Sequence, residues 1–282
     1  MADLTPHYDD RATGAVKSVP VEIAQTIGSF REKFAVIGGA VPWLRLDNPD
    51  MRHVGTLDVD LALHAEALGD GEYATLIEAL KKNGYRQSQD HRPFQLVRRV
   101  PAPDGGPPID VVVNFLMPRG VDIEPHKPLL LPYFNVVRAD GVDLALLFND
   151  IVMVEASMPD GGRNRVEVAV CTIPALIAMK GHALRGRNEQ KDAYDVYYSI
   201  RNYDGGPDAL AVACRPLLEH ESALNGYRIV AEKFETLEGY GPTCVRRFVE
   251  ETQVLDDRTP EQWQMDAFGQ VDAWCRALGL RN

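Results

Sequence analysis

The sequence has no long hydrophobic run, because none of its apolar stretches approaches the ~20 residues that a membrane-spanning helix needs. The first five residues, MADLT, show neither the basic nor the apolar segment of a secretion signal. Cysteine is also scarce, and the four cysteines lie far apart without metal-ligand spacing. We therefore expect reduced, buried thiols, no membrane partner and a cytoplasmic location.

Several common catalytic patterns are missing as well. The seven histidines show no zinc spacing, and no Ser-His-Asp or Cys-His signature is visible. Gly38-Gly39 lacks both the third glycine of the dinucleotide fingerprint and the Gly-Lys-Ser/Thr of a P-loop. The net charge of −11 argues against broad adhesion to nucleic acid but leaves a local basic groove open. Basic residues cluster at Lys81, Lys82 and Arg86, at Arg98 and Arg99, and at Arg185, Arg187 and Lys191.

Two carboxylates stand one residue apart in an otherwise apolar strand. The run from Thr56 to Leu63 contains Asp58 and Asp60. Alternate side chains of a strand share a face at ~3.3 Å per residue, so the two carboxylates lie roughly 7 Å apart. The mutual repulsion and the lost hydration of such a pair cost free energy unless a bound cation compensates for them. Mg²⁺ is suited to this role, because it takes carboxylate oxygens and substrate phosphates as ligands. The pattern indicates metal-dependent phosphoryl or nucleotidyl transfer. The alternative is that the two aspartates lie at an exposed end of the strand and have no catalytic role.

A third carboxylate appears in a later strand. In the predicted strand Ile109–Phe115, Asp110 shares a face with Val112 and Asn114. We expect Asp110 to converge with the first two aspartates and to complete a site for two Mg²⁺ ions. The glycine pair Gly38-Gly39 follows a strand and precedes a helix, where backbone N–H groups approach phosphates closely.

The periodicity predicts a mixed α/β fold followed by an all-helical region, with a composition shift near Thr172. We place a catalytic domain at 18–172 and a helical domain at 173–282, with residues 1–17 as a loose lead-in. Predicted strands are 34–37, 56–63, 95–100, 109–115, 151–158 and 163–170. Predicted helices are 19–33, 40–46, 73–83, 173–185, 190–201, 207–222, 226–238, 242–252 and 260–278.

A second polar cluster runs from Met179 to Asp195. Lys180 interrupts an apolar helix, where it either extends to solvent or places a point charge on a triphosphate. Asp192 and Asp195 share a helix face, and their simplest role is to pair with Arg185, Arg187 or Lys191.

Together these motifs resemble the AbiEii/AbiGii-type nucleotidyltransferases, toxin components within the DNA-polymerase-β-like superfamily. The resemblance covers residues 34–200 and rests on Gly38-Gly39, Thr56-x-Asp58-x-Asp60, the later Asp110, Lys180, Arg187 and Lys191-Asp192-x-Tyr194-Asp195. The family often has an arginine two residues before the Ser/Thr of the aspartate strand, where this chain has Val54.

The resemblance implies an enzyme that binds Mg²⁺ and a nucleoside triphosphate. Asp58 and Asp60 would be metal ligands, while Gly38, Gly39 and Thr56 would contact the triphosphate. Lys180 would neutralise phosphate charge, and Asp192 or Asp195 would complete the catalytic set. We place Arg187 and Lys191 with the nucleotide-binding residues. The acceptor would be RNA, with the tRNA 3′ end foremost, and an antitoxin protein would be a partner.

Two other functions stay open. The acidic composition also suits a small-molecule nucleotidyltransferase of the aminoglycoside-modifying kind, because cationic substrates favour carboxylate-lined clefts. A catalytically inactive nucleotide-binding or partner-binding module is the third possibility.

Overall fold

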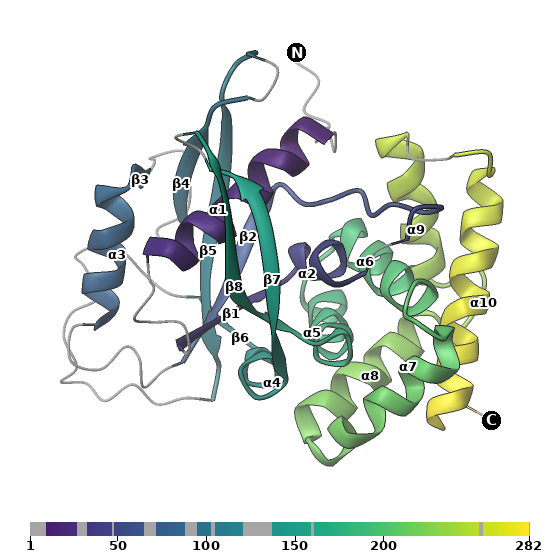
Figure 1. The fold of residues 1–282 in the computed structure, drawn as a ribbon. Coiled ribbons are helices and arrows are strands. Elements are labelled where there is room, and N and C mark those ends of the chain that lie inside the picture. The colour runs from purple at the N-terminus through teal and green to yellow at the C-terminus, as the bar shows by residue number, and fades with distance from the viewer. Residues whose placement is uncertain are drawn as a thin grey trace. The chain divides into compact units, whose positions relative to one another are not determined.

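The structure is a computed structural model of the 282-residue chain. It describes residues 10–26, 33–46, 48–64, 72–87, 95–102, 105–120, 137–158, 161–253 and 256–281 (Figure 1). The chain forms two compact units. The sheet unit holds Tyr8–Leu44 and Gly55–Thr172, and the helical unit holds Arg45–Val54 and Ile173–Asn282. The predicted domains were contiguous, whereas Arg45–Val54 belongs with the helices.

The sheet unit confirms the predicted mixed α/β class. Its strands follow the order β3-β4-β5-β2-β1-β8-β7, with β6 paired to β5. Pairs β1–β2, β3–β4, β4–β5 and β7–β8 are antiparallel, and β1–β8, β2–β5 and β5–β6 are parallel. The strands are β1 (Phe34–Ile37), β2 (Asp58–Leu63), β3 (Tyr85–Arg86), β4 (Gln95–Val100), β5 (Ile109–Pro118), β6 (Val137–Ala139), β7 (Asn149–Ser157) and β8 (Arg163–Cys171). The helices are α1 (Asp10–Thr26), α2 (Ala40–Arg45), α3 (Glu72–Lys82) and α4 (Val142–Leu147).

Helix α1 lies against the sheet face opposite to the aspartates of β2. Arg98 of β4 donates from Nε and Nη2 to Glu22 of α1 at 2.8 and 2.7 Å, and both side chains are buried. Arg99, the next residue, points to the other face because strand side chains alternate. The buried ion pair therefore fixes α1 to one face and leaves the other to the polar residues of β2, β4 and β5.

The helical unit contains α5 (Ile173–Gly186), α6 (Gln190–Arg201), α7 (Gly206–Cys214), α8 (Glu221–Lys233), α9 (Tyr240–Thr252), α10 (Pro260–Leu278) and the short 3₁₀ helix η3 (Arg215–Glu219). Helices α5 and α8 approach each other through a glycine pair. A β-carbon on Gly181 would lie 2.0 Å from the carbonyl oxygen of Gly226. Only glycine permits this backbone contact, which brings the two helices close together.

Most predicted elements are confirmed, and their ends differ by a few residues. Helix α1 begins at Asp10 within the predicted lead-in; residues 1–9 of the lead-in and 27–32 of the predicted helix lie outside the described residues. The predicted helix 207–222 is confirmed as far as Cys214, but its continuation to 222 is wrong, because Pro216 lacks an N–H and the chain changes to a 3₁₀ turn. The short elements β3, β6 and α4 were not predicted.

The four cysteines are buried thiols that form no disulfide, as expected. Among the described residues, no helix combines the length and the apolarity needed to cross a bilayer.

Candidate active site

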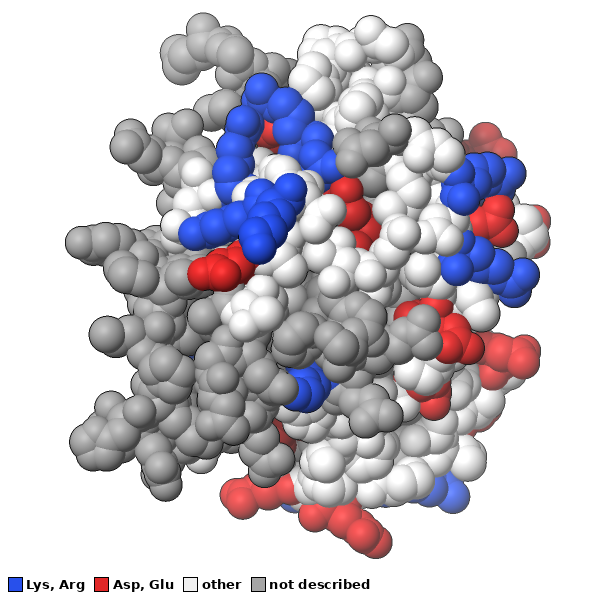
Figure 2. Space-filling view, turned by 60° about the vertical axis from the view of Figure 1, so that its left-hand side comes forward, with Lys and Arg blue, Asp and Glu red and all other residues white. Residues whose placement is uncertain are grey.

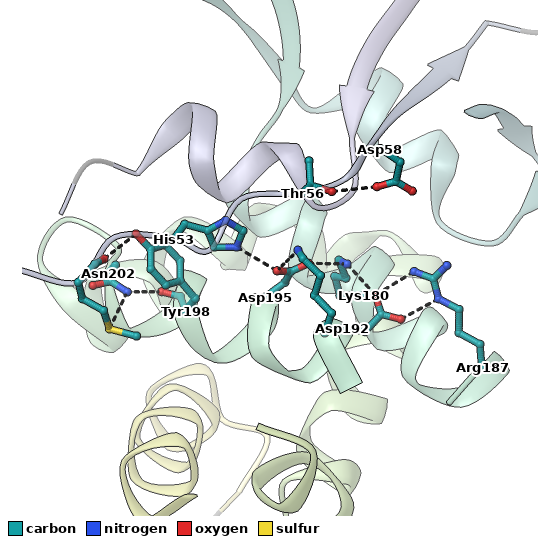
Figure 3. Close-up of polar contacts among 11 residues, drawn as sticks. His53, Thr56, Asp58, Lys180, Arg187, Asp192, Asp195, Tyr198 and Asn202 are labelled. Carbon is teal, nitrogen blue, oxygen red and sulfur yellow. Dashed lines mark hydrogen bonds and ion pairs between the residues drawn. The ribbon is translucent and has the colours of Figure 1, made fainter. Parts of the chain in front are cut away.

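The two aspartates of β2 face the same side of the sheet and converge on one amide. Asn114 Nδ2 donates to Asp58 Oδ2 at 3.1 Å and to Asp60 Oδ1 at 2.7 Å. The parallel register of β2 and β5 pairs Asp60 with Asn114, which places the amide beside both carboxylates. Thr56 Oγ1 donates to the remaining oxygen of Asp58, Oδ1, at 2.8 Å (Figure 3). Both carboxylates are thus held in place by neutral donors.

The glycine turn after β1 lies next to the carboxylate of Asp60. Gly38 has a φ of +71°, and a β-carbon there would lie 2.0 Å from Asp60 Oδ2. Gly39 is buried in the same turn, between β1 and α2. The first glycine is therefore needed both for its left-handed backbone and for the room it leaves to the carboxylate.

Asp110 does not join the other two aspartates, so the expected three-carboxylate cluster is wrong. The register aligns Asp58 with Val112, which leaves Asp110 two residues nearer the start of β5. Arg99 binds its carboxylate through Nε and Nη2 at 2.8 and 2.9 Å, and Arg86 lies 3.9 Å away. In the parts of the chain that the structure describes, no group of three His, Cys, Asp or Glu residues could hold a metal. Asn114 occupies the place that we assigned to Asp110.

The donor set of Asp58 and Asp60 fits a magnesium ion. The amide group of Asn114, whose Nδ2–H hydrogens carry partial positive charge, already donates to an oxygen of each carboxylate. A cation at such a position would replace the amide as the shared partner. Mg²⁺ is commonly held by one or two carboxylates, with phosphates and water as its other ligands. Two carboxylates therefore suffice for one ion that enters with a triphosphate.

A second polar group lies in the helical unit, around Lys180 of α5. Lys180 Nζ lies 2.6 Å from Asp192 Oδ1 and 2.7 Å from Asp195 Oδ2, and its side chain is only 7% exposed (Figure 3). Burial opposes the charge of Lys180, but Asp192 and Asp195 outweigh it and raise the lysine pKa. Burial would likewise raise the pKa of Asp195, yet Lys180 and Lys191 hold it well below its usual range. Lys180, Asp192 and Asp195 are thus all charged.

The remaining predicted nucleotide-binding residues lie on the outer side of this network. Arg187 binds Asp192 through Nε and Nη2 at 2.7 and 2.9 Å, and its side chain is 58% exposed. Lys191 Nζ contacts Asp195 Oδ1 at 2.8 Å. The expected ion pairs are therefore formed by Arg187 with Asp192 and by Lys191 with Asp195. Arg185 instead lies 3.5 Å from Glu232.

His53 belongs to the same network, and the sequence did not indicate it. Its Nε2 lies 3.0 Å from Asp195 Oδ1, and its ring packs edge-on against Tyr198. Burial lowers the pKa of His53 to about 4, with Asp195 opposing the shift, so the neutral ring donates Nε2–H to the carboxylate. Tyr198 donates to the carbonyl of Met51 at 3.0 Å, which holds the segment carrying His53. The only sequence signal was its place five residues before Asp58.

Comparison with known proteins gives a family. The profile of one family, described as nucleotidyl transferase AbiEii toxin of type IV toxin–antitoxin systems, matches residues 30–272. No curated protein matches the chain. A solved structure with some likeness is an antigenic nucleotidyltransferase-like protein from Paracoccidioides brasiliensis, with 19% identity and a TM-score of 0.41, over 75% of this chain and 93% of that chain. The family match includes every site residue described above, and the chain belongs to the AbiEii family of nucleotidyltransferases.

Proposed function

We propose that the protein transfers NMP from a nucleoside triphosphate to a hydroxyl group of RNA in a Mg²⁺-dependent reaction, with the tRNA 3′ end as the leading acceptor. The observation that carries the proposal is the convergence of Asp58 and Asp60 on a single point beside the Gly38 turn. The family supports the triphosphate as substrate and an antitoxin as partner. The acceptor and the metal are the parts that we add.

The chain's own residues would orient the reacting groups. Asp58 and Asp60 would hold Mg²⁺, which polarises the α-phosphate and neutralises charge on the departing pyrophosphate. Thr56 donates to the oxygen of Asp58 that Asn114 does not contact, so this carboxylate stays oriented when the cation takes the place of the amide. The acceptor hydroxyl gives up its proton to solvent and its oxygen bonds to the α-phosphorus, while the bond from that phosphorus to the bridging oxygen of the β-phosphate breaks and pyrophosphate leaves.

Of the predicted nucleotide-binding cations, Arg187 is the one that we assign to a phosphate. Arg187 is the most exposed of the three predicted basic residues, and its guanidinium suits a phosphate. Lys180 already lies between two buried carboxylates, so we assign it the role of holding Asp192 and Asp195 in position. Lys191, less exposed than Arg187, would support Asp195 in the same way.

Labelling of total tRNA with each [α-³²P]NTP in the presence of Mg²⁺ tests the proposal. We expect D58N and D60N to lose transfer by about a thousandfold, which is the effect of removing an electrostatic group that acts in the transition state. The matched control is D140N, because Asp140 is an exposed carboxylate of the same unit that pairs with Arg119. Wild-type labelling of tRNA by D58N would refute the assignment.

A small cationic acceptor is the second candidate, because the net charge of −11 favours such a substrate. Parallel reactions with aminoglycosides, resolved by thin-layer chromatography, distinguish it from transfer to RNA. Binding of NTP without release of pyrophosphate in any of these reactions would indicate an inactive binding module.

A further inference from the structure

The sheet brings together two basic clusters that are separate in the sequence. Strand β3 pairs with β4, so Arg86 lies opposite Val97, two residues from Arg99. The guanidinium groups of Arg86 and Arg99 meet at the same carboxylate, Asp110. Arg98 takes no part, because it is buried against Glu22 on the other face.

These arginines lie on the same face of the sheet as the paired aspartates. The register forms one continuous row across four strands, from Asp58 through Val112 and Val97 to Arg86. Neighbouring strands are about 4.8 Å apart, so three spacings place the backbone of Arg86 about 14 Å from that of Asp58. Arg99 stands in the next row of the same face, opposite Asp110.

The arginines are accessible and keep donors to offer. The side chains of Arg86 and Arg99 are 53% and 54% exposed. A guanidinium has five N–H donors, and Arg99 uses two of them on Asp110. The bidentate contact fixes the plane of the group, so less side-chain entropy is lost when a second anion binds. Asp110 thus orients Arg99.

Two further exposed cations lie close to Arg86 in the sequence. Exposed Lys81 and Lys82 end helix α3, a few residues before β3, and Glu78 is an exposed carboxylate of the same helix. Figure 2 brings the α3, β3 and β4 side forward and shows Lys and Arg side chains gathered there, with Asp and Glu side chains beside them. On a chain with a net charge of −11, such a local group favours a polyanion at this place.

We propose that Arg86 and Arg99, held by Asp110, bind the phosphodiester backbone of the acceptor RNA strand as it approaches Asp58 and Asp60. The inference rests on the proposed function, because it assigns the acceptor of that same site. A strand whose terminal hydroxyl reaches the carboxylate pair carries the phosphates of its preceding nucleotides across neighbouring strands of the sheet. Guanidinium groups bind phosphate in a bidentate manner, and contacts to phosphate carry no base information, so the surface would position the strand without sequence preference.

The test compares R86A/R99A with R163A/R165A. The control removes two exposed arginines from β8, which lies toward the opposite edge of the same sheet from β3 and β4. The dissociation constant for total tRNA is measured by filter binding between 50 and 200 mM salt, and the affinity for a fluorescent NTP is measured in parallel. Each phosphate contact to a single strand contributes about 0.7 to the slope of log K against log salt.

We expect R86A/R99A to bind tRNA at least tenfold more weakly at low salt, with a slope smaller by about 1.4 for two lost contacts. NTP affinity and the properties of R163A/R165A should stay at the wild-type level. Wild-type tRNA affinity and slope in R86A/R99A, with transfer to tRNA intact in the wild type, would overturn the inference and leave the proposed function standing. Absence of tRNA binding by the wild type would overturn both. Loss of binding in R86A/R99A without transfer by the wild type would support the surface and refute the proposed reaction.

Discussion

The carboxylate of Asp60 lies over the backbone of Gly38, so that a β-carbon at position 38 would come within 2.0 Å of Asp60 Oδ2. The turn after β1 and the second aspartate of β2 are therefore parts of one arrangement. A side chain at position 38 must displace the proposed metal ligand.

Gly38→Ala should consequently lose nucleotide transfer by about a hundredfold, because a shift of about 1 Å in a reacting group has that effect. Gly105→Ala is the matched control, since Gly105 has a φ of +73° and a β-carbon there would meet no atom within 4 Å. Both variants carry the strain of the left-handed backbone, about 1–2 kcal/mol. Gly38→Ala also forces Asp60 to move, so urea unfolding should show the larger loss of stability for this variant. Equal transfer rates in the two variants would contradict the role of this contact.

The aspartate pair could be predicted from the sequence because the alternation of side chains along a strand is a local property. The predicted first and last residues of α6 and β4 also agree with the structure. Asp110 was misassigned because the register between β2 and β5 depends on tertiary pairing, which the sequence does not show. Alternation had placed Asp110 and Asn114 on one face, and the register selects Asn114. His53 was missed for a similar reason, since its partner Asp195 lies 142 residues away. Short elements such as β3 were missed because two residues carry no periodicity.

Asn114→Asp should make the stability of the protein dependent on magnesium. The variant places a third carboxylate beside Asp58 and Asp60, where the amide now donates to both. Repulsion among the three carboxylates should lower the melting temperature in EDTA, and Mg²⁺ should restore it by binding to the folded state. The measurement is the Mg²⁺-induced shift in melting temperature, with Asn149→Asp as the control, because Asn149 caps the end of α4 away from the pair. Equal shifts in both variants would contradict a cation site between the aspartates.

Lys180→Met should destabilise the protein, because it leaves two buried carboxylates without their shared cation. Breaking a buried pair in this way costs about 3–5 kcal/mol. Arg187→Ala removes a half-exposed partner of Asp192 while Lys180 remains, so a loss of about 1 kcal/mol or less is expected. For Arg187→Ala we expect a higher KM for NTP. Urea unfolding and steady-state kinetics on both variants test this division of roles; a Lys180→Met protein as stable as Arg187→Ala would contradict it.

Asp110→Asn separates two roles for that carboxylate. If Asp110 were a metal ligand, Asp110→Asn would lower kcat roughly a thousandfold, as expected for D58N. A residue that orients Arg99 should instead raise KM for tRNA by several fold and leave kcat within about tenfold, because the asparagine still accepts one hydrogen bond from the guanidinium. Steady-state kinetics with tRNA as the varied substrate distinguish the two. A loss of kcat equal to that of D58N would restore Asp110 to the metal site.

His53 should make stability fall as the pH is lowered from about 6.5 to about 4. Its pKa is lowered from 6.5 to about 4 by burial, so across this range the unfolded chain binds a proton that the folded chain does not. Stability therefore rises with pH in this window, by up to about 1.4 kcal/mol per pH unit for one proton. The lowered pKa values of Asp192 and Asp195 act in the same direction at lower pH, since protonating these carboxylates breaks their ion pairs.

The variant His53→Gln isolates the histidine contribution, because glutamine can still donate to Asp195 but does not titrate. Urea unfolding of wild type and His53→Gln at pH 7, 6 and 5 should show a smaller acid-induced loss in the variant. His182→Gln is the control, as His182 is a half-buried histidine of the same unit that contacts the carbonyl oxygen of Ser222. Equal losses of stability in wild type and His53→Gln between pH 7 and 5 would contradict the assignment of His53 as a neutral, buried residue that positions Asp195.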